Sequence, residues 1–259
     1  MPVPVATTPA VTPPAVRPVR PTGWADSART IGTAMVLALM LRIFAYEPFS
    51  IPSESMLPNL FVGDYLFVAK WRYGFSRHAV PGSPELFGGR LLPVSPERGD
   101  VAVFKTPRDN RTDYIKRVIG LPGDRIEMRQ GRLSINGQQV RTDSAPDLVM
   151  PDGRHYQQYR ETLPNGRSYL VLDTVRSGRG DNSGVFTVPG GHLFMMGDNR
   201  DDSADSRFSL AEGGIGFVPT DNLIGRASVS FFSTDGSATA LDPRSWWTAL
   251  RSDRVGLVF

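Results

Sequence analysis

The chain contains one strongly apolar stretch, and it lies near the N-terminus. Residues 31–41 read IGTAMVLALML without a charge, and with their neighbours in 24–45 they approach the ~20 residues that a helix needs to cross the hydrocarbon core of a bilayer. No small-x-small site of the kind at which signal peptides are cut follows the run. The pattern therefore favours a retained transmembrane anchor over 24–45, with a cleaved leader and a buried core helix as the weaker alternatives.

The residues before the apolar stretch set its expected orientation. Residues 1–23 consist largely of Pro, Val, Ala and Thr, a composition that buries too little apolar surface to fold, so we expect a disordered tail. Arg17, Arg20 and Arg29 lie on this side, and positive charge marks the cytoplasmic side of a membrane helix. The bulk of the chain should therefore face outward.

Beyond residue 46, apolar positions come in short runs typical of β-strands, separated by turns that contain glycine and proline. The predicted strands are 65–69, 101–104, 114–119, 125–128, 192–196 and 227–232. Residues 76–97 are rich in Gly and Pro and predict a long loop, whereas Asn136-Gly137 is a hairpin signal. The pattern indicates a mainly β fold preceded by one helix.

This pattern also suggests how the chain is divided. We assign 46–140 and 190–235 to a β core, and the more polar residues 141–189 to an inserted β subdomain. Residues 236–259 form a C-terminal segment. Its Trp246-Trp247 pair, with arginines nearby, indicates either an interfacial helix or a short helix that caps the core.

Composition narrows the possible chemistry. The 259 residues include no cysteine, which excludes disulfides, thiol nucleophiles and zinc held by cysteine. The three histidines, His78, His155 and His192, lie far apart, so a histidine metal site or a Ser-His-Asp triad would need long-range assembly. The net charge of +3 includes no basic run of the nucleic-acid-binding type. We expect no metal, no cofactor and no nucleic acid partner.

The turn at 52–58, Pro-Ser-Glu-Ser-Met-Leu-Pro, is the first candidate for chemistry. Ser53 and Ser55 lie one residue apart between prolines that restrict the backbone, and such a turn can hold a hydroxyl in a fixed direction. That arrangement suits a nucleophile. The alternative is a connector whose serines only hydrogen-bond to their own backbone.

Lys116 is the second candidate, one of only three lysines among 29 lysine and arginine residues. In the predicted strand 114–119, side-chain alternation places it on the same face as Tyr114 and Val118. If that face is the inner one, burial lowers the lysine pKa toward neutrality, and a neutral amine can remove the proton of a serine hydroxyl. If the strand lies at an edge, the amine instead extends to water.

The stretch 197–207, Gly-Asp-Asn-Arg-Asp-Asp-Ser-Ala-Asp-Ser-Arg, is rich in aspartate. It is not an EF-hand calcium loop, because it lacks the glycine and the glutamate that such a loop requires at positions six and twelve. It predicts a solvated acidic turn with local ion pairs, or else a segment in which Ser203 orients a buried amine and the carboxylates brace basic side chains.

Together these segments resemble those of bacterial type I signal peptidases, membrane-anchored proteases with a Ser/Lys dyad. The similarity runs, in the family's order, through residues 46–58, 63–65, 98–101 with 114–124, and 197–207. Several motifs in one order are far more specific than any single motif. The loop 76–97 and the insert 141–189 match only in their placement.

The resemblance implies a role for each motif residue. Ser55 would be the nucleophile and Lys116 the general base, while Ser53 and the Ser55 backbone N–H would form the oxyanion hole. Ser203 would position the lysine amine. Glu54 lies where family members vary and receives no role. The supporting ion pairs would join Asp198 to Arg117 and Asp205 to Arg207.

The resemblance also implies a substrate and a location. The reaction would be removal of signal peptides from exported preproteins after small residues, of the Ala-x-Ala type. The protein would cross the bacterial inner membrane once, with its N-terminus in the cytoplasm and its catalytic domain on the periplasmic or outer face. It would contact lipid and come transiently close to the secretion translocon. Only about ten residues, spanning at most ~35 Å, separate residue 45 from Ser55.

Two other functions fit parts of the sequence. A self-cleaving repressor-type protease shares a Ser/Lys dyad and a related β core, but the anchor and the aspartate-rich stretch argue against it. A membrane-tethered β domain that binds partners without catalysis needs neither Ser55 nor Lys116.

Overall fold

The structure is a computed structural model that describes residues 23–79, 88–175, 177–238 and 242–259. Residues 1–22 of the predicted tail, and 80–87 of the predicted loop at 76–97, lie outside the described residues. The chain divides into two units, Met1–Leu39 and Met40–Phe259.

A helix, α1 (Trp24–Phe44), occupies the interval where the apolar pattern predicts one. Asp26 lies in its first turn, where a carboxylate interacts favourably with the positive end of the helix dipole. Within the part of the chain that the structure describes, no helix combines the length and the hydropathy that crossing a membrane requires. The anchoring role of this segment stays a prediction.

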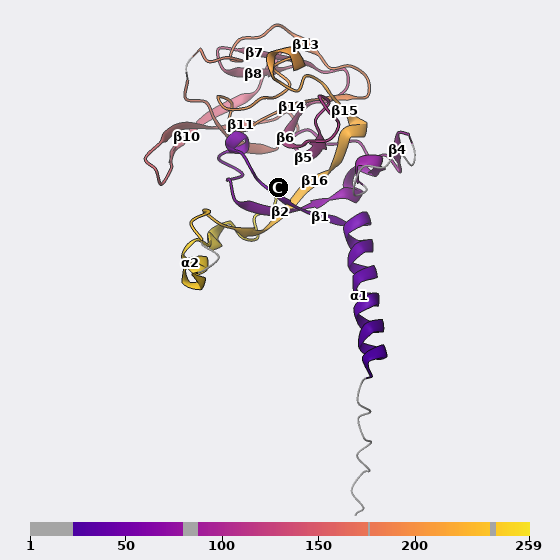
Figure 1. Cartoon of the computed structure of the whole chain (residues 1–259). Helices are drawn as coiled ribbons and strands as arrows, with labels where there is room; N and C mark the ends of the chain where they lie inside the picture. The colour runs from indigo at the N-terminus through magenta and orange to yellow at the C-terminus, as the bar shows by residue number, and fades with distance from the viewer. Residues whose placement is uncertain (1–22, 80–87, 176, 239–241) are drawn as a thin grey trace, which may run out of the picture. The chain divides into compact units, whose positions relative to one another are not determined.

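The largest sheet has seven strands in the order β1-β2-β16-β5-β6-β14-β15, all paired antiparallel (Figure 1). The strands are β1 (Tyr46–Ser50), β2 (Asp64–Ala69), β5 (Val101–Lys105), β6 (Asp113–Gly120), β14 (His192–Met196), β15 (Val218–Pro219) and β16 (Leu223–Ser233). The register of β16 shifts twice against β2, and such bulges bend a strand. The prediction of a mainly β fold is confirmed.

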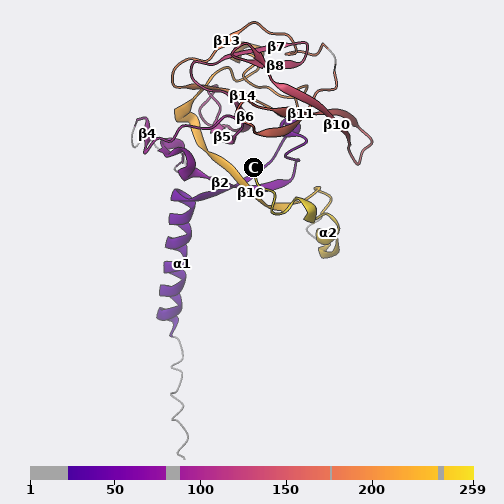
Figure 2. The same ribbon diagram turned by 180° about the vertical axis from the view of Figure 1, so that it is seen from behind.

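Smaller sheets lie beside the large one, and Figure 2 shows β7, β8 and β13 grouped together. One has the order β13-β7-β8-β9, formed by β13 (Phe186–Thr187), β7 (Arg125–Arg129), β8 (Arg132–Ile135) and β9 (Gln138–Gln139). A second consists of β10 (Arg141–Val149), β11 (His155–Thr162) and β12 (Ser168–Leu172). A two-stranded ribbon pairs β3 (Phe75–Ser76) with β4 (Arg90–Leu91).

Strand pairing crosses the predicted boundary at residue 140. Phe186 of β13, from the predicted insert, pairs with Ile126 of β7, from the predicted catalytic core. One hydrophobic cluster likewise joins Met128 and Leu133 to Val171 and Val188. Residues 141–189 therefore share a sheet and a buried core with residues 125–139.

Strand β5 is apolar on both faces because it separates two hydrophobic clusters. Val101 and Val103 pack into one cluster, whereas Ala102 and Phe104 pack into the other. The neighbouring strand β6 follows the same alternation, with Ile115 in the first cluster and Val118 in the second. Lys116 of β6 is the register partner of Ala102 of β5. It therefore lies where hydrophobic clusters cover both faces of the sheet.

The C-terminal segment begins with a short helix, α2 (Pro243–Thr248), whose N-cap is Asp242. The chain then returns to the large sheet, where Val258 forms a bridge with Val229. Arg254 donates hydrogen bonds to the buried Asp64 carboxylate, with distances of 2.6 Å and 2.9 Å for the two shortest contacts. The end of the segment is thus attached to the β core. The interfacial role of the Trp246-Trp247 pair stays untested.

Candidate active site

The candidate nucleophile lies in a tightly held turn between β1 and β2. Ser55 is in the 3-10 turn η1 (Glu54–Met56), and the side chains of Met56 and Leu57 that follow it are fully buried. The Asn199 backbone N–H donates to the Ser55 carbonyl at 3.1 Å. The buried side chains and the backbone hydrogen bond hold the backbone of the turn at Ser55 in place.

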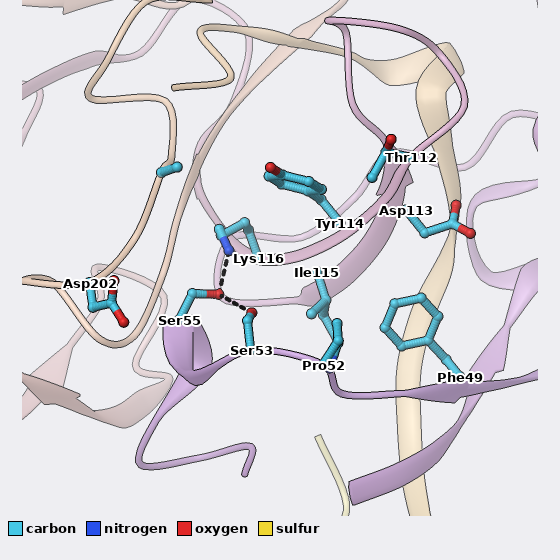
Figure 3. A pocket seen from close by; sticks show the side chains of 11 residues that line it. Phe49, Pro52, Ser53, Ser55, Thr112, Asp113, Tyr114, Ile115, Lys116 and Asp202 are labelled. Carbon is cyan, nitrogen blue, oxygen red and sulfur yellow. Dashed lines mark hydrogen bonds between the residues drawn. The ribbon is translucent and has the colours of Figure 1, made fainter. Parts of the chain in front are cut away.

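Strand β6 brings Lys116 to this hydroxyl. The Lys116 Nζ lies 2.6 Å from the Ser55 Oγ, and the Ser53 Oγ lies 3.3 Å from the same oxygen (Figure 3). Lys116 is only 4% exposed and Ser55 8%. The strand face that carries Lys116 is therefore the inner one. Two residues 61 positions apart in sequence meet as a hydroxyl and an amine in hydrogen-bonding contact.

Burial changes the protonation of this lysine. Removal from water lowers the pKa of the Lys116 ammonium from its ordinary value of 10.5 to about 8, even though Asp205, Asp198 and Asp202 raise it. Arg207 lowers it further. Near neutral pH an appreciable fraction of the amine is therefore uncharged and able to accept a proton.

Ser203 also lies at this site, but without a hydrogen bond. A Cβ added at Gly197 would lie 2.3 Å from the Ser203 Oγ and 2.5 Å from the Ser55 carbonyl oxygen, so the three residues are in close contact. The Ser203 Oγ is buried and has no hydrogen-bond partner among the described residues. Its predicted role in positioning the lysine stays a prediction.

Both predicted ion pairs are present. Arg117 donates from Nε and NH2 to the two oxygens of Asp198, at 2.7 Å and 2.6 Å, and its guanidinium lies over the ring of Tyr169. Arg207 donates from Nε and NH2 to the two oxygens of Asp205, at 2.9 Å each. All four charged residues are buried. The Arg117–Asp198 pair joins β6 to the stretch 197–207, and the Asp205–Arg207 pair lies within that stretch.

Two further ion pairs were not expected from the sequence. Arg200 donates to both oxygens of Glu161 at 2.9 Å and 2.5 Å, and the pair is almost fully buried. Arg154, in the turn between β10 and β11, donates to both oxygens of Glu54 at 2.7 Å and 2.8 Å. The partners are 39 and 100 residues apart, so spacing in the sequence carries no signal for either pair.

A pocket of about 390 Å³ opens at the Ser55 hydroxyl. It is lined by Phe49, Pro52, Ser53, Ser55, Thr112, Asp113, Tyr114, Ile115, Lys116, Asp202 and Ala204 (Figure 3). The lining comes from β1 and its following turn, from β6 and the residue before it, and from the stretch 197–207. A hydroxyl, an adjacent amine and a second hydroxyl at the floor of an open pocket are suited to acyl transfer.

One cluster of three carboxylates lies elsewhere in the described chain. Ligand atoms of Asp173, Asp181 and Asp201 lie within 4.8 Å of one another. Asp201 already accepts the Thr174 and Val175 backbone N–H groups, and Asp181 accepts that of Gly178. Asp201 and Asp181 therefore stabilise their loops through these bonds, and none of the three carboxylates lines the Ser55 pocket.

This chain is similar to several known proteins. The family described as signal peptidase, peptidase S26, matches residues 24–232. A signal peptidase I of Rickettsia typhi is 41% identical over 206 residues, which cover 76% of this chain and 76% of the relative. A signal peptidase I of Rickettsia canadensis is 38% identical over 218 residues, which cover 81% of this chain and 80% of the relative. A solved signal peptidase I of Enterococcus faecalis is 30% identical and covers 51% of this chain and 97% of its own, with a TM-score of 0.31.

Proposed function

The chain belongs to the signal peptidase I family, peptidase S26, and from this premise we propose that Ser55 and Lys116 form the dyad with which it removes signal peptides. As a member it is a serine endopeptidase, so the non-catalytic alternative and the self-cleaving repressor do not apply. The observation that carries the proposal is the 2.6 Å contact between the Ser55 Oγ and the buried Lys116 amine.

Acylation begins with the uncharged amine. Lys116 accepts the Ser55 proton while the oxygen attacks the carbonyl carbon of the scissile bond. The carbonyl oxygen becomes an oxyanion, to which the Ser55 backbone N–H and the Ser53 hydroxyl donate hydrogen bonds. When the C–N bond breaks, the Lys116 ammonium returns its proton to the departing amine. The mature protein leaves, and the signal peptide remains as an ester on Ser55.

Deacylation repeats the sequence with water. Lys116, neutral again, takes a proton from a water molecule that attacks the ester carbonyl, and then gives that proton to the Ser55 oxygen as the ester breaks. The signal peptide departs with a carboxylate, and the dyad is restored. Ser203 lies close to Gly197, and in this proposal it limits the movement of the lysine amine during both half-reactions.

The substrates we propose are preproteins cleaved after small residues of the Ala-x-Ala type. The pocket walls include Phe49, Pro52 and Ile115, which favour uncharged groups of limited size. We further propose that residues 24–45 anchor the protein in the bacterial inner membrane, with the N-terminus in the cytoplasm. The protein would then contact lipid and would come transiently close to the secretion translocon. Incubation of detergent-solubilised protein with a precursor tests the proposal, and mass spectrometry of the product should show cleavage after a small residue.

Activity should depend on pH through Lys116. Because the pKa of Lys116 is about 8, about one-tenth of the Lys116 amine is uncharged at pH 7 in the free enzyme. This uncharged fraction is about 300-fold larger than it would be with a pKa of 10.5. Below pH 8, kcat/KM should fall about tenfold per pH unit as the amine becomes charged, and above pH 8 it should level off. The profile is measured with a peptide substrate for which chemistry limits the rate. A profile that stays flat into acid would rule out lysine as the base.

Loss of the Ser53 hydroxyl should weaken oxyanion stabilisation. We expect Ser53→Ala to lower kcat about 100-fold or more with little change in KM, because the hydroxyl donates to an oxygen that is charged only in the transition state. Ser53→Thr keeps the hydroxyl and should recover part of the rate. Equal losses in the two variants would show that the turn was disturbed and that the hydroxyl is not the cause.

A further inference from the structure

The active-site pocket contains one carboxylate without a partner. Two aspartates line the pocket, Asp113 and Asp202. Asp113 lies 2.7 Å from the ammonium of Lys105. Asp202 is exposed, and its carboxylate accepts no hydrogen bond and forms no ion pair with any described residue. A negative charge at the mouth of the pocket is thus left available to a substrate.

The unpartnered carboxylate lies at one end of the pocket. Figure 3 shows Asp202 on one side of Ser55, and Pro52, Ile115 and Phe49 on the other. One end of the pocket therefore carries the unpaired Asp202 carboxylate, and the other carries apolar side chains together with Asp113, whose charge is offset by Lys105 (Figure 3). The Ser55 hydroxyl lies between the two ends. The field of Asp202 reaches the reacting groups, because its charge is among those that raise the pKa of Lys116.

A peptide cleaved at Ser55 must lie across both ends. The residues before the scissile bond are small and uncharged in the proposed substrates, and they fit the end formed by Phe49, Pro52 and Ile115. The residues after the bond, which become the N-terminus of the mature protein, then extend toward Asp202. A side chain there meets a carboxylate that nothing else neutralises.

We propose that Asp202 selects preproteins by charge, favouring a basic side chain and disfavouring an acidic one at the first two residues after the scissile bond. This inference rests on the proposed function. Because Asp202 is exposed, each charge contact should change kcat/KM by about 2- to 5-fold, the range of surface ion pairs, and should weaken as salt screens it.

The test uses the full chain in detergent micelles and internally quenched peptides with one cleavage site. The peptides differ only at the first or second residue after the site, which is Lys, Gln or Glu. At low ionic strength, Lys peptides should exceed Glu peptides in kcat/KM by about tenfold, and about 0.5 M salt should bring the ratio close to one. Asp202→Asn should remove most of the preference, and Asp202→Lys should reverse it.

A matched control uses Asp147, an exposed carboxylate on β10 that does not line the pocket. Asp147→Asn should leave the preference unchanged. The inference would be overturned if the unmodified protein cleaved Lys and Glu peptides at equal rates, or if the preference survived in Asp202→Asn. In either case, cleavage of the Gln peptide would still support the proposed function. If no peptide is cleaved, the proposed function and the inference fail together.

Discussion

Replacement of Lys116 by methionine is expected to lower the rate of signal peptide cleavage by about 10⁴-fold or more. Methionine fills a similar volume in the buried position of β6 but cannot accept the Ser55 proton. Ser55→Ala should cause a loss of the same order, because neither group acts without the other. The double variant should be no worse than either single variant. Single-turnover cleavage of a precursor, followed by gel electrophoresis, measures all three.

The matched control is Lys105→Met, which removes another lysine of the same sheet. The Lys105 Nζ donates to the Arg111 carbonyl at 2.8 Å and pairs with Asp113, at the surface of the protein. This variant should keep most of the cleavage activity. Lys116→Met should unfold at the same temperature as the unmodified protein or a higher one, because a buried ionisable group is replaced by an apolar one. If Lys116→Met retains a tenth of the normal rate while folded, another group must be the base.

Removal of Glu161 should destabilise the fold by about 3–5 kcal/mol, because it leaves the Arg200 guanidinium charged and buried without its carboxylate. Arg200 is 3% exposed and Glu161 1% exposed, so water cannot replace the lost partner without rearrangement. The Tyr169 hydroxyl donates to the Glu161 carboxylate at 2.7 Å, so the substitution removes this acceptor as well. Because Arg200 belongs to the same stretch as Ser203, cleavage should slow too. Denaturant unfolding of Glu161→Ala in detergent measures the free energy.

The pair of Glu127 and Arg129, whose glutamate side chain is half-buried, provides the comparison for this prediction. Its arginine side chain is 75% exposed, and Glu127→Ala should change the free energy of unfolding by less than about 1 kcal/mol. Replacing both Glu161 and Arg200 by methionine should recover much of the loss, since no unpaired charge is left inside. A loss below 1 kcal/mol in Glu161→Ala would mean that water or another group satisfies Arg200.

Strand patterns and short motifs predicted the mainly β fold, the strand face that carries Lys116 and the protein family. Period-two alternation in residues 114–119 placed Lys116 on one face with Tyr114 and Val118, and the structure has that face turned inward. The motifs also identified the family, which the comparisons confirm. Alternation could not tell whether the lysine is buried or reaches water, because that depends on what packs against the strand.

Residue types, backbone restriction and periodicity are local properties, and they indicated a β scaffold with Ser55 and Lys116 as candidates. The roles proposed for the two residues came from the order of several motifs, which resembles that of a known family. Distances between groups far apart in the chain are not local. Folding alone decided that Lys116 lies 2.6 Å from Ser55, that Arg200 pairs with Glu161, and that β13 joins β7. The physical reason is that a buried charge is stable only beside a suitable partner, and packing of the whole chain determines which partner is within reach.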